Sequence, residues 1–216
     1  MNKSSDTSTF LLGEVHGALM SLPSGQITPV TEFVTIGYSG GEAVAVFASR
    51  LDAEICRQYL NQRNQHGSKN RYQVIVNSDQ RVGILKRTGN PPARLIVGFV
   101  VDHVTHKLVV QGGLYSLMHY DLHMADQHWL LCGGAKPDYS VIDSVRRDFL
   151  MMGVPNYLDE LTEIESLDEK SLVDLAKLAV LQIGSLSSGV PAVPVVFSLR
   201  HKSWIELKVG GQHGAR

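Results

Sequence analysis

The chain is of moderate length and almost neutral. Its 216 residues include 44% hydrophobic ones, which is enough to bury one substantial core. The 20 Lys and Arg residues are balanced by 21 Asp and Glu residues, and the net charge of −1 argues against a protein devoted to nucleic acid.

Cysteine content and hydropathy bear on the compartment. The two cysteines, Cys56 and Cys132, are too few for a disulfide framework, which fits a reducing cytoplasm. The apolar run near the N-terminus is interrupted by Glu14 and His16, unlike a secretory signal, and no apolar run approaches the roughly 20 residues of a spanning helix. We therefore expect a soluble cytoplasmic protein without a membrane partner.

The first part of the chain starts with a polar stretch, residues 1–9, which we expect to be a disordered tail. Residues 10–22 predict a short helix that ends before Pro23, because a residue that precedes proline avoids the helical region. Val, Ile and aromatic residues predict a strand over 32–38, and the apolar run at 43–48 fits a buried strand.

A clear helix signal follows these strands. Ser49 is typical of a helix N-cap, and Leu51, Ile55 and Tyr59 recur every four residues. This pattern predicts a helix that begins near residue 50 and ends before Gly67.

Shorter elements are predicted in the middle of the chain. Apolar and β-branched residues indicate strands over 72–76, 94–103 and 107–111. Asn77, with Gln80 three residues later, is typical of the cap of a short helix that would extend to residue 86.

The last third is predicted to contain two helices. Val145 and Phe149 lie on one face of a helix that starts at residue 140 and stops at Gly153. A capping box that starts at Ser166 predicts a mostly apolar helix ending at Gly184.

A β-hairpin is predicted to close the fold. Its strands cover residues 193–198 and 204–209. Pro191 and Pro194 predict that the first of these strands lies at a sheet edge, because proline cannot donate a hydrogen bond to a neighbouring strand.

Together these elements predict an α+β fold with a mixed, mainly antiparallel sheet packed by helices. It has a helical block at about 138–184 and a C-terminal β-hairpin. We expect one domain over residues 10–209, followed by a flexible tail at 210–216. The alternative is a small doubly wound α/β sheet, since residues 71–103 are compatible with a βαβ unit, although its helix is short for a crossover.

The sequence GYSGG at residues 37–41 matches the G-x-S-x-G pattern, which presents a nucleophilic serine on a strand-to-helix turn. A helix should then begin almost at Ser39, so that backbone N–H groups meet the oxyanion. Instead an apolar strand follows, and the next helix cap lies at Ser49. The Asp-Gly partner of a patatin-type dyad is also missing. We interpret the segment as a hairpin turn and predict no catalytic residue.

Five of the nine histidines fall between residues 103 and 128. In a strand, His119, Asp121 and His123 would share a face, whereas in a helix the two histidines would lie one turn apart. Neither an HExxH nor a CxxC pattern accompanies them. We interpret them as a solvated polar face with Tyr120 packed inward, and predict no metal site.

Two further chemical signals are weak. Cys132 next to a glycine pair is compatible with a thiol nucleophile, but is more typical of a small buried side chain. Neither GxxxxGK[ST] nor GxGxxG occurs, so we predict no nucleotide and no other cofactor.

Charge is distributed unevenly along the chain. Residues 57–94 contain eight basic residues against one acidic residue, a net charge of +7, whereas residues 138–174 contain ten acidic against three basic residues, a net charge of −7. Complementary poles of this kind can meet within one protein or steer two proteins together. The predicted binding residues are those of the basic segment: Arg57, Arg63, Lys69, Arg71, Lys86 and Arg87.

These observations predict a non-enzymatic accessory protein that acts through protein–protein contacts, as a subunit of a larger assembly or as a homo-oligomer. The first alternative is nucleic-acid binding by residues 57–94, where Asn, Gln and Tyr accompany the basic residues. The second is a hydrolase that uses Ser39 or the histidines at 103–128.

Overall fold

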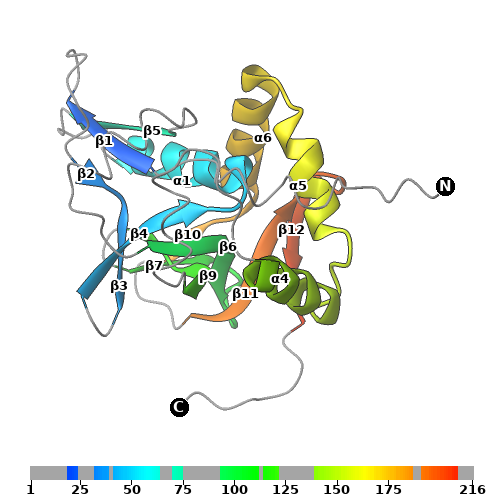
Figure 1. Cartoon of the computed structure of the whole chain (residues 1–216). Coiled ribbons are helices and arrows are strands. Elements are labelled where there is room, and N and C mark those ends of the chain that lie inside the picture. Colours follow the sequence, from blue (N-terminus) through cyan, green and yellow to red (C-terminus); the bar gives the residue numbers. More distant parts are fainter. Residues whose placement is uncertain are drawn as a thin grey trace.

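The computed structural model describes residues 19–23, 32–38, 41–63, 70–74, 93–111, 114–121, 139–186 and 191–208. These residues form helices packed on a mixed, mainly antiparallel sheet, which confirms the predicted α+β class. Figure 1 shows the helices α4, α5 and α6 on the right of the molecule and the β3–β4 hairpin on the left. The predicted terminal tails lie outside the described residues.

The large sheet is built around the long strand β6 (Ala93–Asp102). The first half of β6 pairs in parallel with β4 (Gly41–Phe47) and antiparallel with β9 (Leu117–Asp121). Its second half pairs with β11 (Pro191–Ser198), which pairs in turn with β12 (Ser203–Glu206). The predicted C-terminal hairpin is therefore present as β11 and β12.

Shorter strands extend this sheet. The strand β3 (Thr35–Tyr38) pairs antiparallel with β4, and β7 (Leu108–Gln111) pairs antiparallel with β6 and with β8 (Leu114–Tyr115). The two-residue strand β10 (Ser185–Leu186) pairs in parallel with β7.

A separate three-stranded sheet contains the start of the described chain. Its central strand β1 (Leu19–Pro23) pairs antiparallel with β2 (Glu32–Phe33) and with β5 (Asn70–Val74). The helix predicted over residues 10–22 is therefore wrong for its last four residues. Pairing with a strand some 50 residues away supplies their backbone hydrogen bonds, which local propensity cannot reveal.

The helix α1 (Arg50–Arg63) follows the prediction closely. The Ser49 hydroxyl accepts a hydrogen bond from the Asp52 backbone N–H at 3.3 Å, and Leu51 and Ile55 are fully buried. Because α1 follows β4 and precedes β6, it lies in the connection between two parallel strands, where a helix is the usual crossover.

The remaining helices are α4 (Tyr139–Met151), α5 (Tyr157–Glu165) and α6 (Glu169–Gln182). The positive φ of Gly153, +87°, lies just beyond α4, where glycine was predicted to stop the helix. The helix α5 has no counterpart in the sequence prediction. The N-cap of α6 is Asp168 rather than Ser166, because the Asp168 carboxylate accepts the Ser171 N–H at 2.9 Å.

The prediction that Pro191 and Pro194 place their strand at a sheet edge is wrong, because β11 lies between β6 and β12. The pairing shifts by one residue between Pro191 and Val193. The Pro194 carbonyl accepts the Leu207 N–H at 2.8 Å, so the backbone groups of Pro194 point toward the end of β12. The missing N–H of this proline therefore does not interrupt its pairing with β6.

Candidate functional site

A groove opens over one face of the large sheet, where α6 ends. We call it the Trp204 groove. Its volume is about 390 Å³, enough for a large side chain of another molecule. Its lining comes from β6, β11, β12, the β6–β7 turn and the end of α6: Val101, His106, Gln182, Ile183, Val195, Trp204 and Glu206.

Strand alternation places Trp204 and Glu206 on the same face of β12. The Trp204 ring meets Phe99 and Phe197 edge to face, with centroids 5.3 and 5.6 Å away, and its Nε1–H donates to the Ala179 carbonyl at 2.9 Å. The indole is thus held rigidly between the sheet and α6. Because α6 ends at Gln182, part of the apolar floor stays uncovered by that helix.

The polar side chains at the rim of the groove are also held in place by hydrogen bonds. The His106 Nδ1 lies 2.5 Å from Glu206 Oε1, and Gln182 Nε2 donates to the Lys202 carbonyl at 2.7 Å. The turn that carries His106 is held by the Asp102 carboxylate, which accepts the N–H groups of Val104 and Thr105. The polar side chains of the rim are therefore held by hydrogen bonds within the chain.

Two strongly exposed apolar side chains are close in sequence to residues of this rim. Val104, two residues before His106, is 71% exposed, and Leu181, which precedes Gln182, is 83% exposed. Covering such side chains by another molecule would remove apolar area from water, which is favourable.

Of the predicted binding residues, the structure describes the side chain of Arg57 alone. Its Nε donates to Glu54 Oε2 at 2.6 Å, and this hydrogen bond raises the pKa of the Arg57 guanidinium. Arg57 is thus engaged within its own helix. The side chains of Arg63, Lys69, Arg71, Lys86 and Arg87 lie outside the described residues, so the nucleic-acid alternative stays a prediction.

Much of the acidic segment is engaged inside the chain. Glu160 is buried and binds the β11–β12 turn, Glu163 pairs with Arg200 of the same turn, and Asp168 caps α6. Glu169 pairs with Arg50 at the start of α1 and also raises the pKa of Arg57. Among the described side chains, Glu169 thus links the acidic segment electrostatically to Arg57 of the basic segment.

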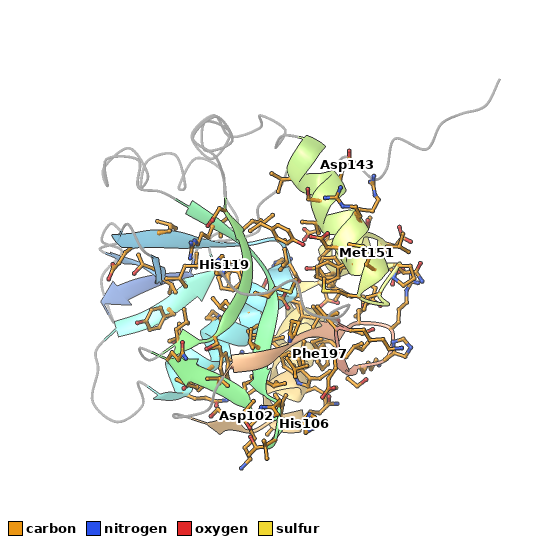
Figure 2. The ribbon with its side chains drawn as sticks, turned by 90° about the horizontal axis from the view of Figure 1, so that it is seen from below. Asp102, His106, His119, Asp143, Met151 and Phe197 are labelled. Atoms are coloured by element: carbon orange, nitrogen blue, oxygen red, sulfur yellow. The ribbon has the colours of Figure 1, made fainter. Side chains whose placement is uncertain are left out.

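The histidines do not form one cluster among the described residues. His119 and Asp121 are exposed on β9 while Tyr120 turns inward and donates to Asp148 at 2.7 Å, as strand alternation predicted. Figure 2 shows His106 and His119 well apart, at different ends of the sheet. His123 and His128 lie outside the described residues, as does Cys132; Cys56 is buried in α1.

The G-x-S-x-G segment joins two paired strands. Tyr38 pairs with Gly41 across it, and a strand, β4, follows where a nucleophile turn requires a helix. The hairpin interpretation is confirmed by this pairing. Ser39 itself lies outside the described residues.

The sequence did not single out the Trp204 groove. Strand alternation is the signal that would place Trp204 and Glu206 on one face, but no local pattern indicates that α6 ends beside them. The groove is a product of long-range packing.

In the described part of the chain, no helix is both long and apolar enough to cross a membrane. Nor do three or more His, Cys, Asp or Glu side chains of the described residues converge as metal ligands do. Comparison with protein-family models, with curated proteins and with solved structures finds no match for this chain.

Proposed function

We propose that the chain is a non-enzymatic accessory protein that binds another protein chain through the Trp204 groove. One observation carries this proposal. A groove with an apolar floor and a fixed tryptophan is lined by residues close in the chain to Val104 and Leu181, which are among the most exposed large apolar residues described. Protein interfaces commonly place an aromatic anchor in such a centre and a polar rim around it.

The partner we propose is an extended protein segment that inserts an apolar side chain into the groove. The Leu207 N–H donates to Pro194 of β11, so alternation turns the backbone groups of Trp204 and Glu206 away from β11, toward the outer side of β12. Among the described strands β12 is the last of its sheet, and we propose that a partner strand pairs with those groups. Its side chain would then enter the groove from the sheet edge.

Site-specific crosslinking in living cells tests this proposal. A photo-reactive amino acid is placed at Val104, at Leu181 and, as a control, at Asp143 on the exposed face of α4. We expect one protein species to be captured at both groove positions and absent at the control. A self-adduct at both groove positions would identify a second copy as the partner.

A matched pair of variants distinguishes binding in the groove from nonspecific binding by exposed apolar side chains. Leu181→Asp introduces a charge in the last turn of α6, next in the chain to Gln182 of the groove, whereas Leu150→Asp does the same on α4, where Leu150 is 60% exposed. Figure 2 shows the end of α4, marked by Met151, far from His106. Leu181→Asp should abolish capture at Val104, and Leu150→Asp should leave it unchanged. No adduct at the groove positions, or equal loss in both variants, would refute the proposal.

A further inference from the structure

A small internal cavity lies where two strands that pair with the same edge of β6 end. The strand β4 pairs with residues 93–96 of β6 and β11 pairs with residues 99–102, whereas β9 occupies the opposite edge. Since β4 runs parallel to β6 and β11 antiparallel to it, the C-terminal ends of β4 and β11 converge near Val97. The helix α5 covers this point, and its Tyr157 hydroxyl donates to the Val97 carbonyl at 3.0 Å.

Two buried carboxyl groups border this cavity. Its polar lining comes from the start of α1, from α5 and from the end of β11: Ser49, Asp52, Tyr157, Glu160 and Ser198. Asp52 and Glu160 are 3% and 7% exposed. The described lining contains no Lys or Arg. Two acidic side chains from different helices therefore share one internal space without a basic side chain of the described lining between them.

The described cations of α1 are bound elsewhere. Arg57 pairs with Glu54 of its own helix. Arg50 pairs with Glu169 of α6. Neither guanidinium is thus left over for the carboxyls of the cavity.

The two carboxyls differ in their hydrogen bonds. Glu160 accepts the Ser198 hydroxyl at 2.9 Å and the Leu199 N–H at 2.8 Å, which stabilises its ionised form. The carboxyl of Asp52 has no such donor among the described residues; the Ser49 hydroxyl accepts from its backbone N–H instead. Burial raises the pKa of Asp52 from 3.8 to about 7. The folded arrangement therefore suits a neutral Asp52 beside an ionised Glu160.

The cavity leaves no room to hydrate a second charge. Its volume is about 10 Å³, at the lower limit for a single water molecule. An ionised Asp52 would be a buried charge without a partner and would face the like charge of Glu160, and both effects disfavour the closed arrangement.

We propose that Asp52 and Glu160 form a pH-sensitive switch, in which loss of the Asp52 proton separates α5 and the β11–β12 turn from α1 and admits water. The helix α5 is suited to this movement. It has nine residues, fewer than the other described helices, and its N-cap residue Asn156 makes no side-chain capping bond. Through Ser198 and Leu199, Glu160 carries the turn with it.

The switch reaches the Trp204 groove but does not depend on what binds there. The strand β12 follows the β11–β12 turn directly and carries Trp204. A displacement of the turn therefore changes the position of one wall of the groove.

Three further titratable groups lie around the two carboxyls. Cys56 of α1 and Tyr157 of α5 both have a pKa raised by burial, so they stay neutral near pH 7. His201 of the β11–β12 turn has its Nδ1 3.0 Å from the Ser198 hydroxyl oxygen. Because histidine is titratable in the same pH range, the test has to separate His201 from Asp52.

Hydrogen exchange of the Leu199 amide tests the proposal, because this N–H donates to Glu160. Its protection, corrected for the intrinsic exchange rate, is measured by nuclear magnetic resonance at pH 6 and pH 8. In the wild type we expect it to fall about tenfold, the factor by which an open form with ionised Asp52 gains population when the folded pKa is about 7. In Asp52→Asn it should stay nearly constant.

Low urea concentrations show whether the opening is local. Exchange of the Leu199 N–H should hardly respond to urea, because a local opening exposes little new surface. The reference is the Val100 N–H, which donates to the Ser116 carbonyl at 2.9 Å inside the sheet and should respond as global unfolding does.

Two control variants should keep the fall in Leu199 protection. They are His201→Gln, which removes the other titratable group of the turn, and Glu163→Gln, which neutralises an exposed carboxyl of the same helix. Constant Leu199 protection in the wild type, an equal fall in Asp52→Asn, or a urea response of Leu199 equal to that of Val100 would overturn the proposal.

Discussion

The Glu160 carboxylate of α5 accepts a hydrogen bond from the Ser198 hydroxyl at 2.9 Å in the protein interior. Its second oxygen accepts the Leu199 N–H at 2.8 Å. A helix that the sequence pattern did not predict thus holds the turn of the predicted C-terminal hairpin. Because β12 of this hairpin carries Trp204 and Glu206, the contact also positions the Trp204 groove.

Removing this carboxylate should destabilise the protein strongly. We expect Glu160→Ala to lower the free energy of unfolding by about 2–4 kcal/mol, since two buried hydrogen bonds to a charged group are lost together. The matched control is Glu163→Ala, which removes an exposed pair with Arg200 on the same turn and should have a much smaller effect. Urea unfolding at neutral pH measures both, and equal losses would contradict the assignment.

Asp52 should make stability depend on pH. Its side chain, 3% exposed, borders a small internal cavity of about 10 Å³ that is also lined by Ser49 and Glu160. Burial raises its pKa from 3.8 to about 7. The folded protein therefore keeps a proton that the unfolded chain releases near pH 4, so this stabilisation is full below that pH and is lost as the pH rises to about 7.

The neutral analogue Asp52→Asn should remove this dependence. At pH 8 we expect the variant to be more stable than the wild type by up to about 4 kcal/mol, because the wild type must then ionise a carboxyl whose pKa in the folded protein is about 7. At pH 4 the two proteins should be similar in stability. Urea unfolding at both pH values checks the difference, and a variant that loses stability between them as steeply as the wild type does would refute the role of Asp52.

Gly98 should tolerate no side chain. A Cβ at this position would lie 2.8 Å from the Val195 carbonyl oxygen and 3.0 Å from a Val196 methyl group, and the first of these is backbone that cannot rotate away. We expect Gly98→Ala to cost about 1–3 kcal/mol of stability, because β6 and β11 must move apart.

The control for this substitution is Gly37→Ala, where a Cβ meets nothing within 4 Å. Its effect should stay within about 0.5 kcal/mol, as for most surface changes. Thermal unfolding distinguishes the two variants. If Gly37→Ala lowers the unfolding temperature as much as Gly98→Ala does, the effect comes from the backbone conformation of glycine and not from crowding between β6 and β11.

The N-cap of α6 can be assigned by two alanine variants. Asp168 accepts both the N–H and the hydroxyl of Ser171, which lowers the pKa of its carboxyl. Ser166 instead donates to the Glu163 carbonyl at the end of α5. Asp168→Ala should lower the unfolding temperature at neutral pH, and more than Ser166→Ala does.

The pH dependence of this cap gives a further check. Because the folded pKa of Asp168 lies below the unfolded one, its contribution is present above the unfolded pKa and is lost as the pH falls through the folded value. The difference between wild type and Asp168→Ala should therefore shrink in acid. If Ser166→Ala lowers the unfolding temperature more than Asp168→Ala does, Ser166 rather than Asp168 is the N-cap of α6, as the sequence predicted.

The sequence by itself determined the elements whose signals are local. The recurrence of Leu51 and Ile55 after Ser49 placed α1, because a cap and a helical period act within a few residues. The strands β6 and β11 followed from dense runs of β-branched residues, and the α+β class followed from their order.

Only the tertiary structure decided how these elements meet. It turned residues 19–22 into a strand by pairing them with β5, and it placed β11 inside the sheet despite its prolines. The Trp204 groove depends on where α6 ends relative to β11 and β12, which is set by contacts between residues far apart in the chain. Local patterns carry no information on such distances, because packing of the whole core sets them.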